Sequence, residues 1–189
     1  MRFPVRVPLL TLAAATLLTG CTRRADTILS GALLDEQPAQ ETWDVTLALS
    51  TGERPRALVR AAYLARFERA DSTFARFGPA APEDTTRVTV RVFDDDGVLT
   101  STVRSDRLLY FDEERRFIAE GRVVVRTESG KTLRSEELTW DEAGRSLQTD
   151  GFVQITTPDE DLQGYRLVSD EDMETYTLAR ITGQVKVEE

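Results

Sequence analysis

The sequence has no histidine, one cysteine and two lysines among its 189 residues. Without histidine the chain cannot build a Ser-His-Asp triad, and it lacks a common side-chain ligand of zinc. A single cysteine allows no disulfide within the chain, so packing and backbone hydrogen bonds must hold the fold. The formal net charge of −9 is opposite in sign to the basic surface that binds nucleic acids. The composition therefore argues against a nucleic-acid-binding protein and implies no metal and no cofactor.

Acidic residues are plentiful, but they gather in short segments that have the composition of turns. Turns favour aspartate and glycine for backbone reasons, and charges keep a β-surface soluble. The sequence Asp94-Asp95-Asp96-Gly97 lacks the alternating ligands of a calcium loop. A polysaccharide lyase would need acids and lysines on one concave face, and the lysines are only Lys131 and Lys186. We therefore predict that the protein is not an enzyme and that the acids are solvated turn residues, at 94–96, 112–114, 159–161 and 170–172.

The first twenty residues have the pattern of a secretory signal peptide. Arg2 and Arg6 precede a mostly apolar stretch at 7–18, which is too short to span a membrane permanently. The stretch ends in Leu-Thr-Gly-Cys21, which resembles the bacterial lipobox and implies that Cys21 becomes the lipid-modified first residue. Acyl chains add about 0.8 kcal/mol per buried CH₂, so they would anchor the protein firmly. Removal of residues 1–20 takes away two arginines and no acid, which changes the net charge from −9 to −11.

The remaining chain divides into a tether and one domain. We predict a tether at residues 21–40, which lack sustained periodicity, and a domain at 41–189. Trp43–Leu49 alternates apolar and polar residues, as a strand does. Residues 56–77 are ambiguous, because their alanines and arginines favour a helix whereas the neighbouring segments favour strands. We expect strands there.

A short sequence motif occurs three times in the second half of the chain. Gly121, Gly151 and Gly183 each open a run of the form Gly-x-Val-x-Val/Ile, with spacings of 30 and 32 residues. Alternation with a period of two is typical of a half-buried strand, and the glycine allows a bend or a close approach of backbones. Ser105–Tyr110 also matches Ser135–Trp140 without a gap. Repeats of this length predict stacked β-hairpins.

The repeated elements together resemble the LptC/OstA-like family of lipopolysaccharide-transport proteins. They are Ser105–Asp112 with Glu120–Val125, and Ser135–Asp141 with Asp150–Ile155, within a resemblance that covers roughly residues 43–187. The resemblance implies an all-β, open, twisted β-jelly roll that binds the acyl chains of lipopolysaccharide in its groove. It also implies two partners, an inner-membrane ABC transporter that supplies the lipid and a periplasmic OstA-like bridge protein that receives it.

Apolar residues of the repeats are the candidates for the lipid groove. Each belongs to an alternating run, so its neighbours along the strand point the other way. The candidates are Leu108, Tyr110, Val123, Val125, Leu138, Trp140, Val153, Ile155, Val185 and Val187. Arginines that could line the rim are Arg122, Arg126, Arg134 and Arg145. The strands expected at the two ends, Trp43–Leu49 and Gly183–Val187, are candidates for strand addition to the bridge protein.

Two questions stay open at this level. A structural or carbohydrate-binding surface lipoprotein on the same β-scaffold is the alternative function, and a closed core without a groove would favour it. The resemblance implies the periplasmic side of the inner membrane, with Cys21 as the lipid anchor. Thr22 is not the aspartate that retains lipoproteins at the inner membrane in well-studied Gram-negative bacteria, and by that rule the protein would reach the outer membrane.

Overall fold

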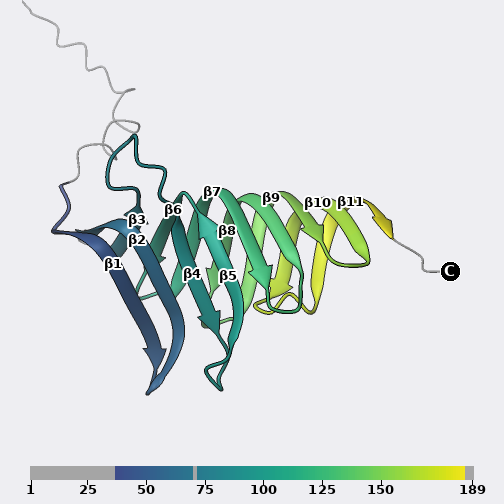
Figure 1. The fold of residues 1–189 in the computed structure, drawn as a ribbon, viewed down its shortest axis with the longest axis horizontal. Coiled ribbons are helices and arrows are strands. Elements are labelled where there is room, and N and C mark those ends of the chain that lie inside the picture. The colour runs from purple at the N-terminus through teal and green to yellow at the C-terminus, as the bar shows by residue number, and fades with distance from the viewer. Residues whose placement is uncertain (1–36, 70–71, 186–189) are drawn as a thin grey trace, which may run out of the picture. The chain divides into compact units, whose positions relative to one another are not determined.

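The computed structural model describes residues 37–69 and 72–185, which form eleven antiparallel strands and no helix (Figure 1). The strands are β1 (Gln40–Thr51), β2 (Arg54–Glu68), β3 (Thr73–Gly78), β4 (Val88–Phe93), β5 (Leu99–Ser105), β6 (Arg107–Phe111), β7 (Arg116–Thr127), β8 (Thr132–Asp141), β9 (Ser146–Thr156), β10 (Glu160–Asp170) and β11 (Tyr176–Val185). The all-β prediction is confirmed. In the ambiguous segment at 56–77, residues 56–68 belong to β2 and 73–77 to β3, and β2 is hydrogen-bonded to neighbours on both of its edges.

One continuous sheet folds back on itself to make two layers. The first half of β2 (Ala57–Arg60) pairs with β4, whereas its second half (Tyr63–Glu68) pairs with β3. The same division occurs in β7, whose start pairs with β6 and whose end pairs with β5. We call the layer that contains β4 and β5 the first layer, and the layer that contains β3 and β6 the second layer. The longer strands run through both, as a jelly roll requires, so the predicted fold class is confirmed.

Bends within the long strands carry the chain from one layer to the other. Four non-glycine residues inside strands have positive φ, between 46° and 56°: Asp44, Arg122, Arg166 and Arg180. A left-handed conformation costs a non-glycine residue on the order of 1–3 kcal/mol, so the surrounding pairing must hold it. The bend at Asp44 also switches the inward face of β1. Trp43 is consequently exposed while Val45 and Leu47 pack against the core, and the unbroken alternation expected for this strand is wrong.

The glycines of the repeated motif differ in their backbone conformation and in how closely other atoms approach them. Gly121 has a φ of 76°, and a Cβ at this position would lie 2.7 Å from Oδ2 of Asp106. A Cβ on Gly183 would lie 2.6 Å from the carbonyl oxygen of Asp161 in the paired strand. Gly151 has neither property, because its nearest contact would be 3.4 Å from a side-chain hydroxyl. A bend and a close approach therefore explain the first and third glycines but not the second.

The hydrophobic core fills the space between the layers. Val59 and Val90 from the first layer and Phe77 and Leu108 from the second are almost completely buried. Three aromatic rings on successive strands of the second layer stack face to face: Tyr110 on Phe117 at 4.4 Å between centroids, and Phe117 on Trp140 at 4.9 Å. Such stacks add to the gain from burial, so this ladder of rings fixes the centre of the roll.

Candidate functional site

The residues predicted to line a lipid groove lie between the two layers. All eight of them that precede β10 are at most 8% exposed, namely Leu108, Tyr110, Val123, Val125, Leu138, Trp140, Val153 and Ile155. Val185 is the last residue of β11, and Val187 and Cys21 lie outside the described residues. The structure therefore brings these eight candidates together on one inner surface. In the centre of the roll this surface is packed and does not form an open groove.

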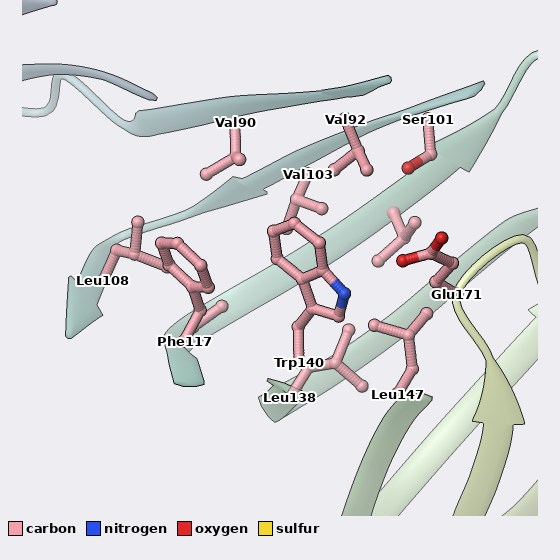
Figure 2. Close-up of a pocket in the computed structure, with 12 residues that line it drawn as sticks. Val90, Val92, Ser101, Val103, Leu108, Phe117, Leu138, Trp140, Leu147 and Glu171 are labelled. Atoms are coloured by element: carbon pink, nitrogen blue, oxygen red, sulfur yellow. The ribbon is translucent and has the colours of Figure 1, made fainter. Parts of the chain in front are cut away.

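The centre contains only a small cavity, of about 30 Å³ (Figure 2). Valines of the first layer face the aromatic ladder of the second layer across it. Its lining is apolar apart from a serine and a glutamate, and consists of Val90, Val92, Ser101, Val103, Leu108, Phe117, Ala119, Val125, Leu138, Trp140, Leu147 and Glu171. This space holds one or two groups the size of a water molecule or a methylene. An acyl chain cannot lie there unless the layers move apart.

Of the two polar groups of the aromatic ladder, the Tyr110 hydroxyl has a hydrogen-bond partner in the protein and Nε1 of Trp140 has none. The hydroxyl of Tyr110 donates to Oδ1 of Asp112 at 2.9 Å, and burial together with this hydrogen bond raises the pKa of Tyr110 above its ordinary value. Nε1 of Trp140 is buried and has no protein partner. A buried N–H group without an acceptor lowers the stability of the fold. Nε1 of Trp140 is therefore placed to donate to a bound polar group such as a water molecule.

A wider cleft of about 300 Å³ opens at the β1 end of the roll. It is roughly ten times the size of the central cavity. Half-buried leucines and a valine make its apolar wall, and a few polar side chains stand at its border; it is lined by Gln40, Thr42, Val45, Leu47, Leu49, Leu64, Arg66, Thr73, Phe74, Ala75, Tyr110 and Asp112. Tyr110 lines this cleft and stacks on Phe117 of the central cavity, so the two spaces are neighbours.

The β11 end also leaves apolar inner surface uncovered. Leu162 of β10 pairs with Gly183, so Ile181 of β11 belongs to the same inward-facing set as Leu162. Ile181 is 56% exposed because no strand follows β11 within the described part of the chain. Among the described strands, β1 pairs only with β2 and β11 only with β10. Each end of the stack therefore presents a free strand edge beside apolar surface.

The four predicted rim arginines occupy different places. Arg122, at the bend of β7, binds Asp106 at 2.8 Å, and this hydrogen bond lowers the pKa of the Asp106 carboxyl. Arg126 and Arg134 are exposed and alternate with buried Val125 and Leu133, so they lie on the outer face. Arg145 alone sits in a turn beside the interior, where its guanidinium reaches Glu171.

Sequence reasoning missed two buried charges, Arg56 and Glu171, each 6% exposed. The prediction that turn acids are solvated is wrong for Glu171, and Glu142, which was not among the predicted acids, is also buried at 9% exposed. A signal for both glutamates was available, because Asp-Glu opens every one of three turns of the second layer, at 112–113, 141–142 and 170–171. Glu142 pairs with Arg115 and Glu171 with Arg145, in each case an arginine of the preceding turn of that layer.

The described part of the chain lacks two further features. Residues 37–69 and 72–185 contain no group of three or more acidic, histidine or cysteine side chains arranged to hold a metal ion. Within the same ranges, no helix is long and apolar enough to cross a membrane.

Comparison with known proteins identifies the family. A family model described as "Lipopolysaccharide-assembly, LptC-related" matches residues 58–186, which extend from β2 to the end of β11. No individual curated protein matches the chain. The family match agrees with the roll of antiparallel strands and confirms the resemblance seen in the repeats. The chain therefore belongs to the LptC-related family, whose members take part in lipopolysaccharide transport and are associated with the periplasmic side of the inner membrane.

Proposed function

We propose that this protein carries the acyl chains of lipopolysaccharide through the interior of its β-roll. It receives the lipid from the inner-membrane ABC transporter of the export system and passes it to a periplasmic OstA-like bridge protein. The observation that carries this proposal is the apolar inner surface, which reaches an uncovered edge at both ends of the stack. A route with two ends suits transfer, whereas a pocket with one mouth suits storage.

Such transfer needs burial and no chemical step. Each methylene group removed from water contributes about 0.8 kcal/mol, so an acyl chain is held by apolar side chains alone. Phosphate groups of the lipid stay outside, because the interior is apolar and the chain has a net charge of −9. The protein therefore acts as a carrier and not as an enzyme.

The free strand edges supply the contacts to neighbouring rolls. An unpaired edge offers main-chain donors and acceptors to another strand, and addition of a strand would continue both the sheet and its apolar inner face. In this arrangement β11 pairs with the bridge protein, since Ile181 lies uncovered beside that edge. The β1 edge, next to the wide cleft, faces the source of lipid.

The anchor in this proposal is lipid attached to Cys21. The apolar segment before Cys21 would direct export and then be removed, and the acyl chains on Cys21 with the short tether after it would hold the roll at the periplasmic face of the inner membrane. Fractionation of membranes, with a Thr22→Asp variant for comparison, tests the location. Recovery of both proteins in the outer membrane would contradict it.

One observation favours the alternative of a structural or carbohydrate-binding surface lipoprotein. The central cavity is small, and a small cavity is expected of a roll that serves only as a scaffold. A crosslinking experiment separates the two functions, with a photoreactive residue at Val153 inside the roll and a control at Arg134 on the outer face. In membranes reconstituted with the transporter, we expect an ATP-dependent lipopolysaccharide adduct at Val153 and none at Arg134. No adduct at Val153 would overturn the carrier function.

A further inference from the structure

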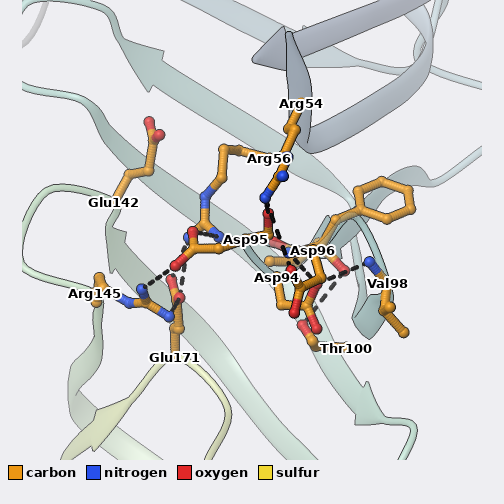
Figure 3. Close-up of polar contacts among 12 residues, drawn as sticks. Arg54, Arg56, Asp94, Asp95, Asp96, Val98, Thr100, Glu142, Arg145 and Glu171 are labelled. Atoms are coloured by element: carbon orange, nitrogen blue, oxygen red, sulfur yellow. Dashed lines mark hydrogen bonds and ion pairs between the residues drawn. The ribbon is translucent and has the colours of Figure 1, made fainter. Parts of the chain in front are cut away.

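The two layers meet along one long side of the roll, away from the bends. The β4–β5 turn (94–98) and the β7–β8 turn (128–131) belong to the first layer there, and the β8–β9 turn (142–145) and the β10–β11 turn (171–175) to the second. We call this line the seam. Side chains from both layers join across it (Figure 3).

Four charged residues form a closed ring of contacts at the seam. Nη2 of Arg56, at the start of β2, lies 3.0 and 3.1 Å from the two carboxylate oxygens of Glu171. Nη2 of Arg145 lies 2.7 Å from the same carboxylate. Asp95 completes the ring, because it accepts from Nη1 of Arg56 at 3.2 Å and from Nη1 of Arg145 at 3.1 Å. Arg56 and Asp95 belong to the first layer, and Arg145 and Glu171 to the second.

The ring has a buried half and an exposed half. The side chains of Arg56 and Glu171 are 7% and 5% exposed, and Arg56 also donates to the carbonyl oxygen of Phe93 at 2.9 Å. Asp95 and Arg145 are largely in water, where ion pairs are screened and weak. Opening would therefore begin on the Asp95–Arg145 side.

A second contact crosses the seam nearby. Nζ of Lys131, in the β7–β8 turn, donates to the carbonyl oxygen of Met173 at 2.6 Å. Met173 is completely buried and belongs to the β10–β11 turn, which also supplies Glu171. The β10–β11 turn is thus tied to the first layer at two points.

The ring stands between water and the central cavity. Glu171 contributes to the lining of that cavity, so the apolar interior lies directly behind the ring (Figures 2 and 3). An acyl chain fits the centre only if the layers separate, and its polar head group must stay in water. In the centre of the roll, only the seam lets an acyl chain enter between separated layers while its head group remains in water.

We propose that Arg56, Asp95, Arg145 and Glu171 form a latch, and that the seam it closes is the lateral port through which a lipid with a charged head group occupies the centre of the roll. This inference rests on the carrier function proposed above. The latch separates the interior from bulk water when no lipid is present, and a moving lipid must break the contacts between Asp95 and Arg145.

The preceding repeat supplies a matched control. Arg115 has the same positive φ of 49° as Arg145, and its guanidinium binds Glu142 of the next turn as Arg145 binds Glu171. The described contacts of Arg115 stay within the second layer, whereas Arg145 also reaches Asp95 of the first. Arg115→Gln therefore removes an equivalent ion pair without touching the latch.

The test measures uptake of a fluorescent fatty acid, cis-parinaric acid, by the full chain in stopped flow. We expect Arg145→Gln and Asp95→Asn to raise the association rate by about fivefold, and Arg115→Gln to leave it within about twofold. A cleavable thiol crosslinker between Asp95→Cys and Arg145→Cys should lower the rate at least about tenfold, with recovery after cleavage. The single-cysteine variants control for reaction at Cys21, and thermal unfolding checks that each variant is folded.

The outcomes separate the latch from the carrier function. Equal rates for Arg145→Gln and Arg115→Gln, or unchanged uptake by the crosslinked protein, would overturn the latch and leave the carrier function standing. If the wild-type chain and all variants bind neither cis-parinaric acid nor lipopolysaccharide, the carrier function fails and the latch fails with it.

Discussion

The two parts of the interior, the β1 end and the centre, differ although the same alternating pattern builds both. At the β1 end the layers leave a cleft of about 300 Å³, and at the centre they leave about 30 Å³. Small residues such as Ala75 face the cleft, whereas stacked rings of Phe117 and Trp140 fill the centre. The seam is also latched beside the centre, at Glu171. One sheet thus leaves open apolar space at one end and packs its two layers together beyond it.

The largest loss of stability should come from removing a large side chain from the centre of the roll. Trp140→Ala removes a ring from the aromatic ladder, and we expect the free energy of unfolding to fall by about 3–5 kcal/mol. Leu47→Ala at the half-buried wall of the cleft should cost only about 1 kcal/mol, because that side chain has fewer packed neighbours. Urea denaturation of both variants measures the difference. Equal losses would contradict the contrast between the two parts.

The next effect concerns the buried acids of the β8–β9 and β10–β11 turns, Glu142 and Glu171. Glu171→Gln removes the buried counterion of Arg56 and leaves it only the exposed Asp95, so we expect a loss of about 3 kcal/mol in the free energy of unfolding. Glu142→Gln should cost about 1 kcal/mol, because its partner Arg115 is half exposed and returns to water. The comparison uses the same urea titration. A smaller loss for Glu171→Gln than for Glu142→Gln would show that the latch does not hold the layers together.

A third comparison sets the bend at Gly121 against Gly151, which has no positive φ. Gly121→Ala forces a side chain into positive φ and against Asp106, so we expect a loss of about 2 kcal/mol. Gly151→Ala meets no close contact and should change the stability by less than about 0.5 kcal/mol. The midpoints of thermal unfolding measure both. Equal sensitivity at the two glycines would mean that the bends do not have the geometry described.

The smallest effect is a difference in pH dependence between the outer surface and the seam. Arg122 holds the pKa of Asp106 below its ordinary value of 3.8, so this carboxylate stabilises the fold above that pH and the gain is lost as the pH falls through the lowered pKa. Burial, and then the neighbouring Glu171, raise the pKa of Asp172, so its ionisation opposes folding as the pH rises above the ordinary value.

Two substitutions separate these opposite signs. Asp106→Asn should flatten the loss of stability on acidification below about pH 4, whereas Asp172→Asn should raise the stability near neutral pH. Thermal unfolding between pH 3 and pH 7 measures both variants against the wild type. The same sign of change for the two variants at pH 7 would contradict the assignment of environments.

Much of the fold was predictable because its repeats are local. The period of two in the repeated runs identifies inward faces, and the structure buries Val123, Val125, Val153 and Ile155. The bend at Asp44 was not predictable, since an aspartate with positive φ leaves no mark on the alternation around it. The latch was also not predictable from local patterns, because Arg56 and Glu171 are 115 residues apart and meet only when the sheet folds back on itself.

The central claim is that lipid passes from the open cleft through the latched centre. It can be tested with photoreactive residues at Leu47 in the cleft and at Trp140 in the centre, in membranes that contain the transporter and lipopolysaccharide. The account predicts ATP-dependent lipopolysaccharide adducts at both positions, with the adduct at Trp140 lost when Asp95 and Arg145 are crosslinked through introduced cysteines. Adducts at Leu47 alone, with or without the crosslink, would contradict it.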